Sequence, residues 1–252
     1  MKIATIIPTL NRPGFLKKAI LSLHHQVKKP DEVFIVDNNA NQNINREVYE
    51  TLLKDTDLNL IYLQNNGSIQ SLRNDIAFKA DCDFLSFLDD DDQWHKSYLE
   101  KSIEILKSKN VKAIYTSMEV INENNEKLNE INLNNDYDVK KLLVFNPGFF
   151  HSNLIVSKDI FISLNGFQSE SGASDKDFFI KLKNNNIKFF INSEKLVLRC
   201  DHDTQWSKNY KKMSIDKITF LKNNFHKLNL LEIYQSLKNV IKFYLKYLKS
   251  LI

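Results

Sequence analysis

The sequence predicts an α/β protein with a mixed, mostly parallel sheet and helices on both of its faces. Three observations support this class. Apolar strand patterns alternate with helical patterns along residues 1–110, as in a doubly wound sheet. The strand patterns are continuous apolar runs, which is typical of strands that are buried on both faces. Polar residues follow these runs directly, at the place where ligands bind in such sheets.

Residues 1–110 predict four strand–helix units. Strands are expected at "KIATIIP", "EVFIVDN", "LNLIYLQ" and "DFLSFLD", and helices at "GFLKKAILSLHHQ", residues 45–54, "SIQSLRNDIAFKA" and "HKSYLEKSIEILKSK". Parallel strands joined by right-handed crossovers have their carboxyl ends at one edge of the sheet. We therefore expect the polar residues that follow these strands to line one rim.

The pattern is less regular after residue 110. Strands are expected at "VKAIYTSMEVI", "FHSNLIVSK" and "IKFFINSEKLVLRCDHD", and helices at "DIFISLNGF" and residues 175–184. Neither a repeat nor a linker separates the two regions, so we expect them to share one sheet. The predicted organisation is a domain of residues 1–207, with a first half (1–110) and a second half (111–207), and a helical tail of residues 208–252.

Composition and charge favour a globular protein. The 252 residues are 42% hydrophobic, with a mean hydropathy of −0.37 and a net charge of +4. Cys82 and Cys200 lack the spacing of a metal site or a disulfide framework. The chain starts with a strand pattern and not with a secretory leader, and no apolar run reaches the about 20 residues that span a bilayer. We expect a cytoplasmic protein with no nucleic-acid partner.

The segment "DFLSFLDDDDQW" places four aspartates at the end of a buried strand. In extended chain, residues i and i+2 point the same way, so Asp89 and Asp91 can face one divalent cation. Mg²⁺ and Mn²⁺ prefer such oxygen ligands. The structural alternative is a solvated turn or a helix N-terminus, with Asp92 as the N-cap of the next helix. We expect both interpretations to hold for different residues: Asp92 caps the helix, while Asp89 and Asp91 hold the cation.

Five segments, taken in order, carry a resemblance to a known family: "IIPTLNRPGFL", "FIVDNNA", "NNGSIQSLRNDIAF", "FLDDDDQW" and "NGFQSESGASDKDFFIKL". Together they resemble the inverting family 2 glycosyltransferases of GT-A fold, over residues 1–207. The resemblance implies that residues 1–110 form a nucleotide-sugar half and residues 111–207 an acceptor half. The resemblance implies transfer of a hexosyl or N-acetylhexosaminyl group from a nucleotide-diphosphate sugar, with UDP as the expected nucleotide. The implied acceptor is a saccharide or lipid-linked glycan of bacterial surface polysaccharide or lipooligosaccharide synthesis.

The resemblance also implies nucleotide-sugar contacts for seven residues: Pro8, Thr9, Leu10, Asp37, Arg73, Asp89 and Asp90. The main chain of the first three would hold the nucleobase, Asp37 would contact the uracil or ribose, and Arg73 would orient the base or diphosphate. By the same resemblance, Mn²⁺ or Mg²⁺ would be held by Asp91, Asp89 and His202. The cation would offset the charge that develops on the departing nucleoside diphosphate.

The general base is the remaining group that glycosyl transfer requires, because an acceptor hydroxyl must lose its proton. The family's Glu–Asp pair falls on Ser174 and Asp175, after the turn "NGF". The resemblance thus implies Asp175 as the base, with Asp177 as the neighbouring candidate. A purely structural alternative is that Asp175 is an acid favoured by the helix dipole.

The chain departs from the family pattern at three places. Leu10 stands where many members have a tyrosine that stacks on the base, and Ser174 replaces the usual glutamate. Asn38 and Asn39 replace an acid and a glycine. Two other functions stay open: a catalytically inactive carbohydrate- or metal-binding module, and a sugar nucleotidyltransferase. A sugar nucleotidyltransferase is less well supported, because this chain has no glycine-rich phosphate loop after its first strand.

The tail predicts an amphipathic helix. Seven apolar residues recur at helical spacing, namely Leu230, Tyr234, Leu237, Ile241, Tyr244, Leu248 and Leu251. Four lysines lie beside them, at positions 238, 242, 246 and 249. Such a helix can lie on the inner face of the cell membrane, pack on its own domain or form a homodimer. All three alternatives remain open.

Overall fold

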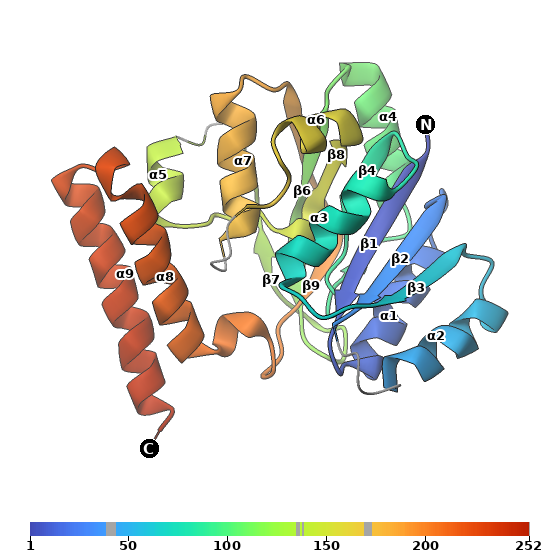
Figure 1. Ribbon diagram of the computed structural model, residues 1–252, viewed down its shortest axis with the longest axis horizontal. Coiled ribbons are helices and arrows are strands. Elements are labelled where there is room, and N and C mark those ends of the chain that lie inside the picture. Colours follow the sequence, from blue (N-terminus) through green and yellow to red (C-terminus); the bar gives the residue numbers. More distant parts are fainter. Residues whose placement is uncertain (39–43, 135–136, 138, 169–172, 252) are drawn as a thin grey trace.

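The computed structural model describes residues 1–38, 44–134, 137, 139–168 and 173–251. Asn39, one of the departures from the family pattern, lies outside these residues. A nine-stranded mixed sheet forms the centre, in the order β3-β2-β1-β4-β8-β6-β9-β5, with β7 paired to β6. Helices cover both faces, and a helical hairpin lies beside one of them (Figure 1). The predicted fold class is confirmed.

The first half of the sheet is parallel. Its strands are β1 (Ile3–Thr9), β2 (Glu32–Asp37), β3 (Leu60–Gln64) and β4 (Phe84–Phe87). The connecting helices are α1 (Pro13–His24), α2 (Ile44–Asp55) and α3 (Ile69–Lys79). Thr9 pairs with Asp37, and Asp37 pairs with Gln64. The carboxyl ends of these strands therefore meet at one rim, as predicted.

The second half is mixed. Its strands are β5 (Gln93–Trp94), β6 (Ala113–Ile121), β7 (Lys127–Ile131), β8 (Leu154–Ser157) and β9 (Phe189–Cys200). Its helices are α4 (Tyr98–Lys109), α5 (Val139–Val144), α6 (Lys158–Ser163) and α7 (Ser174–Asn184). Strand β8 runs antiparallel between β4 and β6 and joins the two halves into one sheet. The division into a nucleotide-sugar half and an acceptor half stays a prediction.

Two apolar cores lie on opposite faces of the sheet. Ile3 and Ile7 of β1 pack on one face with α1 and α4, whereas Ala4 and Ile6 pack on the other with α3, α6 and α7. This alternation follows from the two-residue period of a strand. Phe149 and Phe179 stack with ring centroids 3.6 Å apart and fix α7 against the second core.

The tail is helical, as predicted. Helices α8 (Tyr210–Asn224) and α9 (Leu230–Lys249) form an antiparallel hairpin that packs near α5 (Figure 1). A capping box starts α9: the Asn229 side chain accepts from the Glu232 N–H, and the Glu232 carboxylate accepts from the Asn229 N–H. Among the described residues, no helix has the length and apolar character needed to cross a membrane.

The "NGF" turn before α7 depends on a glycine. Gly166 has a φ of +57°, and a Cβ there would lie 2.4 Å from Asn74 Oδ1. That oxygen accepts a hydrogen bond from the Phe167 N–H at 2.9 Å, and Asn74 Nδ2 donates to the Phe167 carbonyl at 2.8 Å. The turn is thereby tied to α3.

We expect Gly166→Ala to lower the free energy of unfolding by roughly 1–3 kcal/mol, because a methyl group disfavours the left-handed conformation and displaces Asn74. Urea denaturation measures the change. The matched control is Gly14→Ala, since a Cβ at Gly14 meets nothing within 4 Å. An equal loss of stability in both variants would contradict this account of the turn.

Candidate active site

The aspartate turn, defined as Asp89–Asp92, lies between β4 and β5 at the rim of the parallel strands. It borders a cavity of about 750 Å³. The cavity walls come from the segment after β1, the start of α3, the start of α7 and helix α8. Residues far apart in the sequence therefore meet at one hollow.

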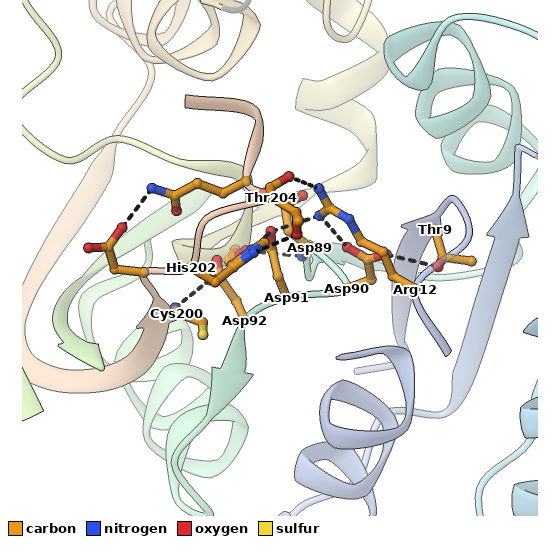
Figure 2. Close-up of polar contacts among 12 residues, drawn as sticks. Thr9, Arg12, Asp89, Asp90, Asp91, Asp92, Cys200, His202 and Thr204 are labelled. Atoms are coloured by element: carbon orange, nitrogen blue, oxygen red, sulfur yellow. Dashed lines mark hydrogen bonds and ion pairs between the residues drawn. The ribbon is translucent and has the colours of Figure 1, made fainter. Parts of the chain in front are cut away.

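Arg12 is the cation at the centre of the turn. Its Nη1 lies 2.9 Å from Asp91 Oδ2 and 3.3 Å from Asp90 Oδ1, and its Nη2 donates to the Thr204 carbonyl at 2.7 Å (Figure 2). Thr9 Oγ1 also donates to Asp90, at 2.8 Å. The sequence analysis missed Arg12. The available signal was a lone arginine in a polar segment after the first strand, next to a predicted acidic rim.

Asp91 also contacts His202. His202 Nε2 lies 2.9 Å from Asp91 Oδ2, and its Nδ1 lies 3.0 Å from Thr204 Oγ1 (Figure 2). Burial tends to raise the pKa of Asp91, but the hydrogen bond to His202 and the Arg12 charge lower that pKa below its usual value. The structure thus brings together two predicted metal ligands that are 111 residues apart in the chain.

Asp89 forms an ion pair with Arg73 of α3. The Arg73 residue is 4% exposed. Arg73 Nε is buried without a hydrogen-bond partner among the described residues, and Arg73 lines the cavity. The Asp89 N–H donates to Ser152 Oγ at 3.0 Å. A guanidinium that lines the cavity is suited to contact an anionic ligand there.

Asp92 does not cap the next helix, so the prediction of a cap at Asp92 is wrong. Helix α4 starts only at Tyr98, with Ser97 before it. Asp92 instead accepts a hydrogen bond from the Cys200 N–H at 3.1 Å and fixes the end of β9 against the turn (Figure 2). The two-residue strand β5 separates the turn from α4, and the sequence patterns did not predict it.

Three carboxylates of the turn fit a divalent cation. Oxygen atoms of Asp89, Asp91 and Asp92 lie within 4.8 Å of one another. Burial, together with the neighbouring carboxylates, raises the pKa values of Asp89 and Asp92. Repulsion of this kind is relieved by a dication, and an all-oxygen set suits Mg²⁺ or Mn²⁺. His202 is in contact with Asp91 but is not one of the three.

Asp175, the predicted base, lies in the first turn of α7 and lines the same cavity. It is 9% exposed, and burial raises the pKa of its carboxyl to about 7. The Lys176 N–H donates to Asp175 Oδ1 at 2.6 Å, and Asn146 Nδ2 lies 3.4 Å from Oδ2. Asp177, the other candidate, is not among the residues that line the cavity.

Ser174, at the position of the family's glutamate, is held by two cavity residues. His151 Nε2 lies 3.1 Å from Ser174 Oγ, and Gln70 Nε2 donates to the same oxygen at 3.4 Å. His151 is buried, and this burial lowers its pKa well below the usual value, so that the ring is neutral. The sequence analysis assigned no role to His151 or Gln70.

The remaining predicted residues divide between the cavity and its surroundings. Pro8 and Leu10 line the cavity, and Leu10 is 44% exposed. Asp37 is fully buried at the end of β2, where it accepts a hydrogen bond from the Tyr62 hydroxyl. Its neighbour Asn38 lines the cavity in its place. The structure does not bring Asp37 to the cavity surface.

Helix α8 forms a wall that the sequence analysis did not expect. Lys212, Lys217 and Phe220 line the cavity opposite the rim. Lys176 Nζ lies 3.7 Å from the centre of the Phe220 ring, which ties α8 to the start of α7. Part of the tail of residues 208–252 therefore forms a wall of the cavity.

A parallel half-sheet with an acidic turn after its fourth strand, joined by an antiparallel β8 to the second half, defines a GT-A fold. The solved structure of Staphylococcus aureus TarS in complex with UDP-GlcNAc shares this fold, with a TM-score of 0.69, 17% identity and coverage of 96% of this chain and 81% of that one. A family model described as Glycosyl transferase family 2 matches residues 4–164. The chain belongs to this family.

Curated relatives support the same assignment. A Campylobacter jejuni GalNAc(5)-diNAcBac-PP-undecaprenol beta-1,3-glucosyltransferase is 37% identical over 98 residues, which are 36% of this chain and 30% of the relative. The Escherichia coli UDP-Glc:alpha-D-GlcNAc-diphosphoundecaprenol beta-1,3-glucosyltransferase WfgD is 26% identical over 122 residues, 48% of this chain and 47% of the relative. The chain therefore spans less than half the length of these two relatives. A sugar nucleotidyltransferase finds no support in these comparisons.

We expect Arg12→Gln to lower the free energy of unfolding by about 2–3 kcal/mol, because two largely buried carboxylates lose their shared cation. Chemical denaturation at neutral pH and low salt measures the loss. Arg46→Gln is the control: its pair with Glu50 is exposed on both sides, so its removal changes stability by less than about 0.5 kcal/mol. Equal effects of the two substitutions would show that the Arg12 contacts are not stabilising.

Proposed function

We propose that this protein is a metal-dependent, inverting glycosyltransferase that uses a nucleotide-diphosphate sugar. The observation that carries the proposal is one cavity that holds both the aspartate turn and Asp175. In this proposal the aspartate turn would hold a cation and the diphosphate, and Asp175, with a pKa of about 7, would act as the base. A single displacement at a sugar carbon needs both groups. A catalytically inactive binding module would not need a base such as Asp175 in the cavity.

The donor is a UDP-sugar in this proposal. TarS is solved with UDP-GlcNAc, and the printed name of WfgD includes UDP-Glc. The main chain at Pro8, Thr9 and Leu10 would contact the base, and Arg73 would contact the diphosphate. Asp89 and Asp90 would contact the ribose side of the nucleotide. Asp37, which lies behind the cavity wall, would act on the nucleotide through its neighbours.

The cation would be held by Asp89 and Asp91, with Asp92 as the third carboxylate and His202 as the group that orients Asp91. When bound, Mn²⁺ or Mg²⁺ supplies positive charge to the departing nucleoside diphosphate. Arg12 and Arg73 add fixed positive charge at the same end of the cavity. The chain's own cations thereby reduce the cost of placing a diphosphate beside four aspartates.

Asp175 acts as the base. Its carboxylate accepts the proton of the acceptor hydroxyl while that oxygen bonds to the anomeric carbon and the bond from this carbon to the diphosphate breaks. The Lys176 N–H donates to Oδ1 at 2.6 Å, whereas Oδ2 has the longer contact with Asn146 Nδ2 at 3.4 Å, so Oδ2 is the oxygen proposed to accept the proton. A pKa of about 7 suits a base that works near neutral pH. Ser174 and His151 would position the acceptor or donor hydroxyls.

The acceptor in this proposal is a saccharide or lipid-linked glycan of a bacterial surface polysaccharide or lipooligosaccharide. The printed names of the two curated relatives describe undecaprenol-linked diphosphate acceptors. The acceptor would enter between α7 and α8, because these helices line the cavity on the side that contains Asp175. The transferred group would be a hexosyl or N-acetylhexosaminyl unit.

The experiment that tests the donor site is thermal stability with UDP-, dTDP-, GDP- and CMP-sugars, each with Mn²⁺ or with EDTA. We expect one UDP-sugar with Mn²⁺ to stabilise the fold by about 2.7 kcal/mol at 100 times its dissociation constant. Asp91→Asn should abolish this shift, while Asp159→Asn, far from the turn, should keep it. No shift with any nucleotide sugar would contradict the proposed activity.

We expect Asp175→Asn to reduce kcat/KM by about 10²–10⁴-fold, because a general base contributes that much, while donor binding is retained. In the unsubstituted enzyme kcat/KM should rise with pH through an apparent pKa near 7, since only the ionised Asp175 carboxyl accepts a proton. A bound dication near Asp89 would move this midpoint lower by offsetting the Asp89 charge. The variant should lose the titration, and a retained rate would exclude Asp175 as the base.

A further inference from the structure

Helix α9 carries apolar side chains on two faces. The inner face packs against α8 and α5, with buried or half-buried side chains at Ile233, Ser236, Val240, Phe243 and Tyr247. Their spacing of three or four residues is that of a single helix face. The apolar stripe singled out in the sequence is a different one, and the structure leaves it exposed.

The outer face is a continuous apolar surface. Its large side chains run from Leu230, which is 87% exposed, to Leu248, which is 40% exposed, with Leu237, Ile241 and Tyr244 between them. These residues follow one another along a helix of 20 residues, about 30 Å long. A run of this length on one face indicates a surface that meets an apolar partner.

The charge beside this surface has one sign. Lys238, Lys242, Lys246 and Lys249 are exposed on α9. Glu232 is the last acid of the chain, and its carboxylate is used in the capping box at the start of the helix. Lys246 Nζ also lies 5.3 Å from the centre of the Tyr210 ring, so this lysine borders α8. The outer face of α9 therefore combines apolar side chains with four lysines, Lys246 at its edge, and no acid after the first turn.

We propose that the outer face of α9 docks on an anionic lipid surface. The leucine and isoleucine side chains would enter the boundary between headgroups and acyl chains, and the lysines would contact lipid phosphates. Tyr234 and Tyr244 fit this depth, because a tyrosine has an apolar ring and a polar hydroxyl. The helix would lie in the plane of the surface.

The charges argue against a second copy of the chain as the occupant. In a two-fold contact the same surface lies on both sides of the interface. Two copies of α9 would bring lysines close to lysines, with no acid from residue 233 onward to pair with them. An anionic lipid surface complements both features, the apolar stripe and the positive charge.

The same helix reaches the cavity from its other side. Ser236 and Asn239 of the inner face line the cavity, and Asn239 Nδ2 donates to the Val144 carbonyl at 3.4 Å. Docking through the outer face would place the α8–α9 wall of the cavity beside the lipid surface. A lipid-linked acceptor could then reach the cavity from the lipid surface. This consequence rests on the proposed function, whereas the docking itself does not.

The experiment is flotation of the full chain with vesicles of phosphatidylcholine alone, or with about a third phosphatidylglycerol. We expect binding to the anionic vesicles only, weakened by salt. Replacing the four lysines of α9 by glutamine should weaken partitioning by more than about 100-fold, since each contributes about fivefold. Ile241→Ser with Leu245→Ser should weaken it by about tenfold per side chain.

The matched control replaces four exposed lysines elsewhere, Lys28, Lys79, Lys107 and Lys188, by glutamine. This variant loses the same net charge, so an equal loss of binding would overturn the proposal in favour of a general charge effect. Failure of the unsubstituted chain to bind anionic vesicles would also overturn it. An α9-dependent dimer in light scattering, without vesicle binding, would do the same and would identify a second copy as the occupant.

Donor binding, measured by thermal shift without lipid, separates this inference from the proposed function. The lysine variant should keep the shift, because its four side chains are exposed and do not line the cavity. If the chain binds vesicles but no nucleotide sugar, the docking inference stands and the proposed function fails. If it binds a nucleotide sugar but no vesicles, the proposed function stands and the docking inference fails.

Discussion

Four adjacent carboxylates lie at the buried end of β4, and the rest of the site depends on how their negative charge is stabilised by cations and hydrogen-bond donors. Isolated buried carboxylates are costly, so each one needs a cation, a hydrogen-bond donor or a shared proton. Arg12, Arg73 and His202 supply charge or donors, and the Cys200 N–H supplies another. These groups come from α3, from the last residue of β9, and from the segments after β1 and β9. Satisfying the turn therefore brings the rim of the cavity together.

The position of β8 explains how the base reaches this turn. Because β8 pairs antiparallel with β4, the chain after it leads through α6 and the Gly166 turn into α7. Asn74 ties this turn to α3 through two hydrogen bonds with Phe167. The stacked rings of Phe149 and Phe179 hold α7 on the sheet. Asp175 is thus positioned by packing around it, and its raised pKa follows from the same burial.

The α8–α9 hairpin forms one wall of the cavity and carries an exposed apolar stripe along α9. Lys176 above Phe220 connects the wall to the start of α7, one residue from Asp175. The inner face of α9 satisfies the packing of α8, so its outer face is not needed for the fold. This division of one helix between packing and an exposed apolar stripe is the physical basis for the inferred lipid contact.

The sequence by itself determined the α/β class, the rim of polar strand ends and the family, because these depend on local periodicity and on short segments in a fixed order. It also singled out Asp89 and Asp91 by their place after a buried strand, and His202 and Asp175 through the family resemblance. Only the tertiary structure decided that Arg12 joins Asp90 to Asp91, that Asp92 holds β9, and that Asp37 is paired with Tyr62 behind the cavity. It also decided which face of α9 is exposed. Such contacts join residues far apart in the chain, and a helix with two apolar faces does not reveal in its periodicity which face packs.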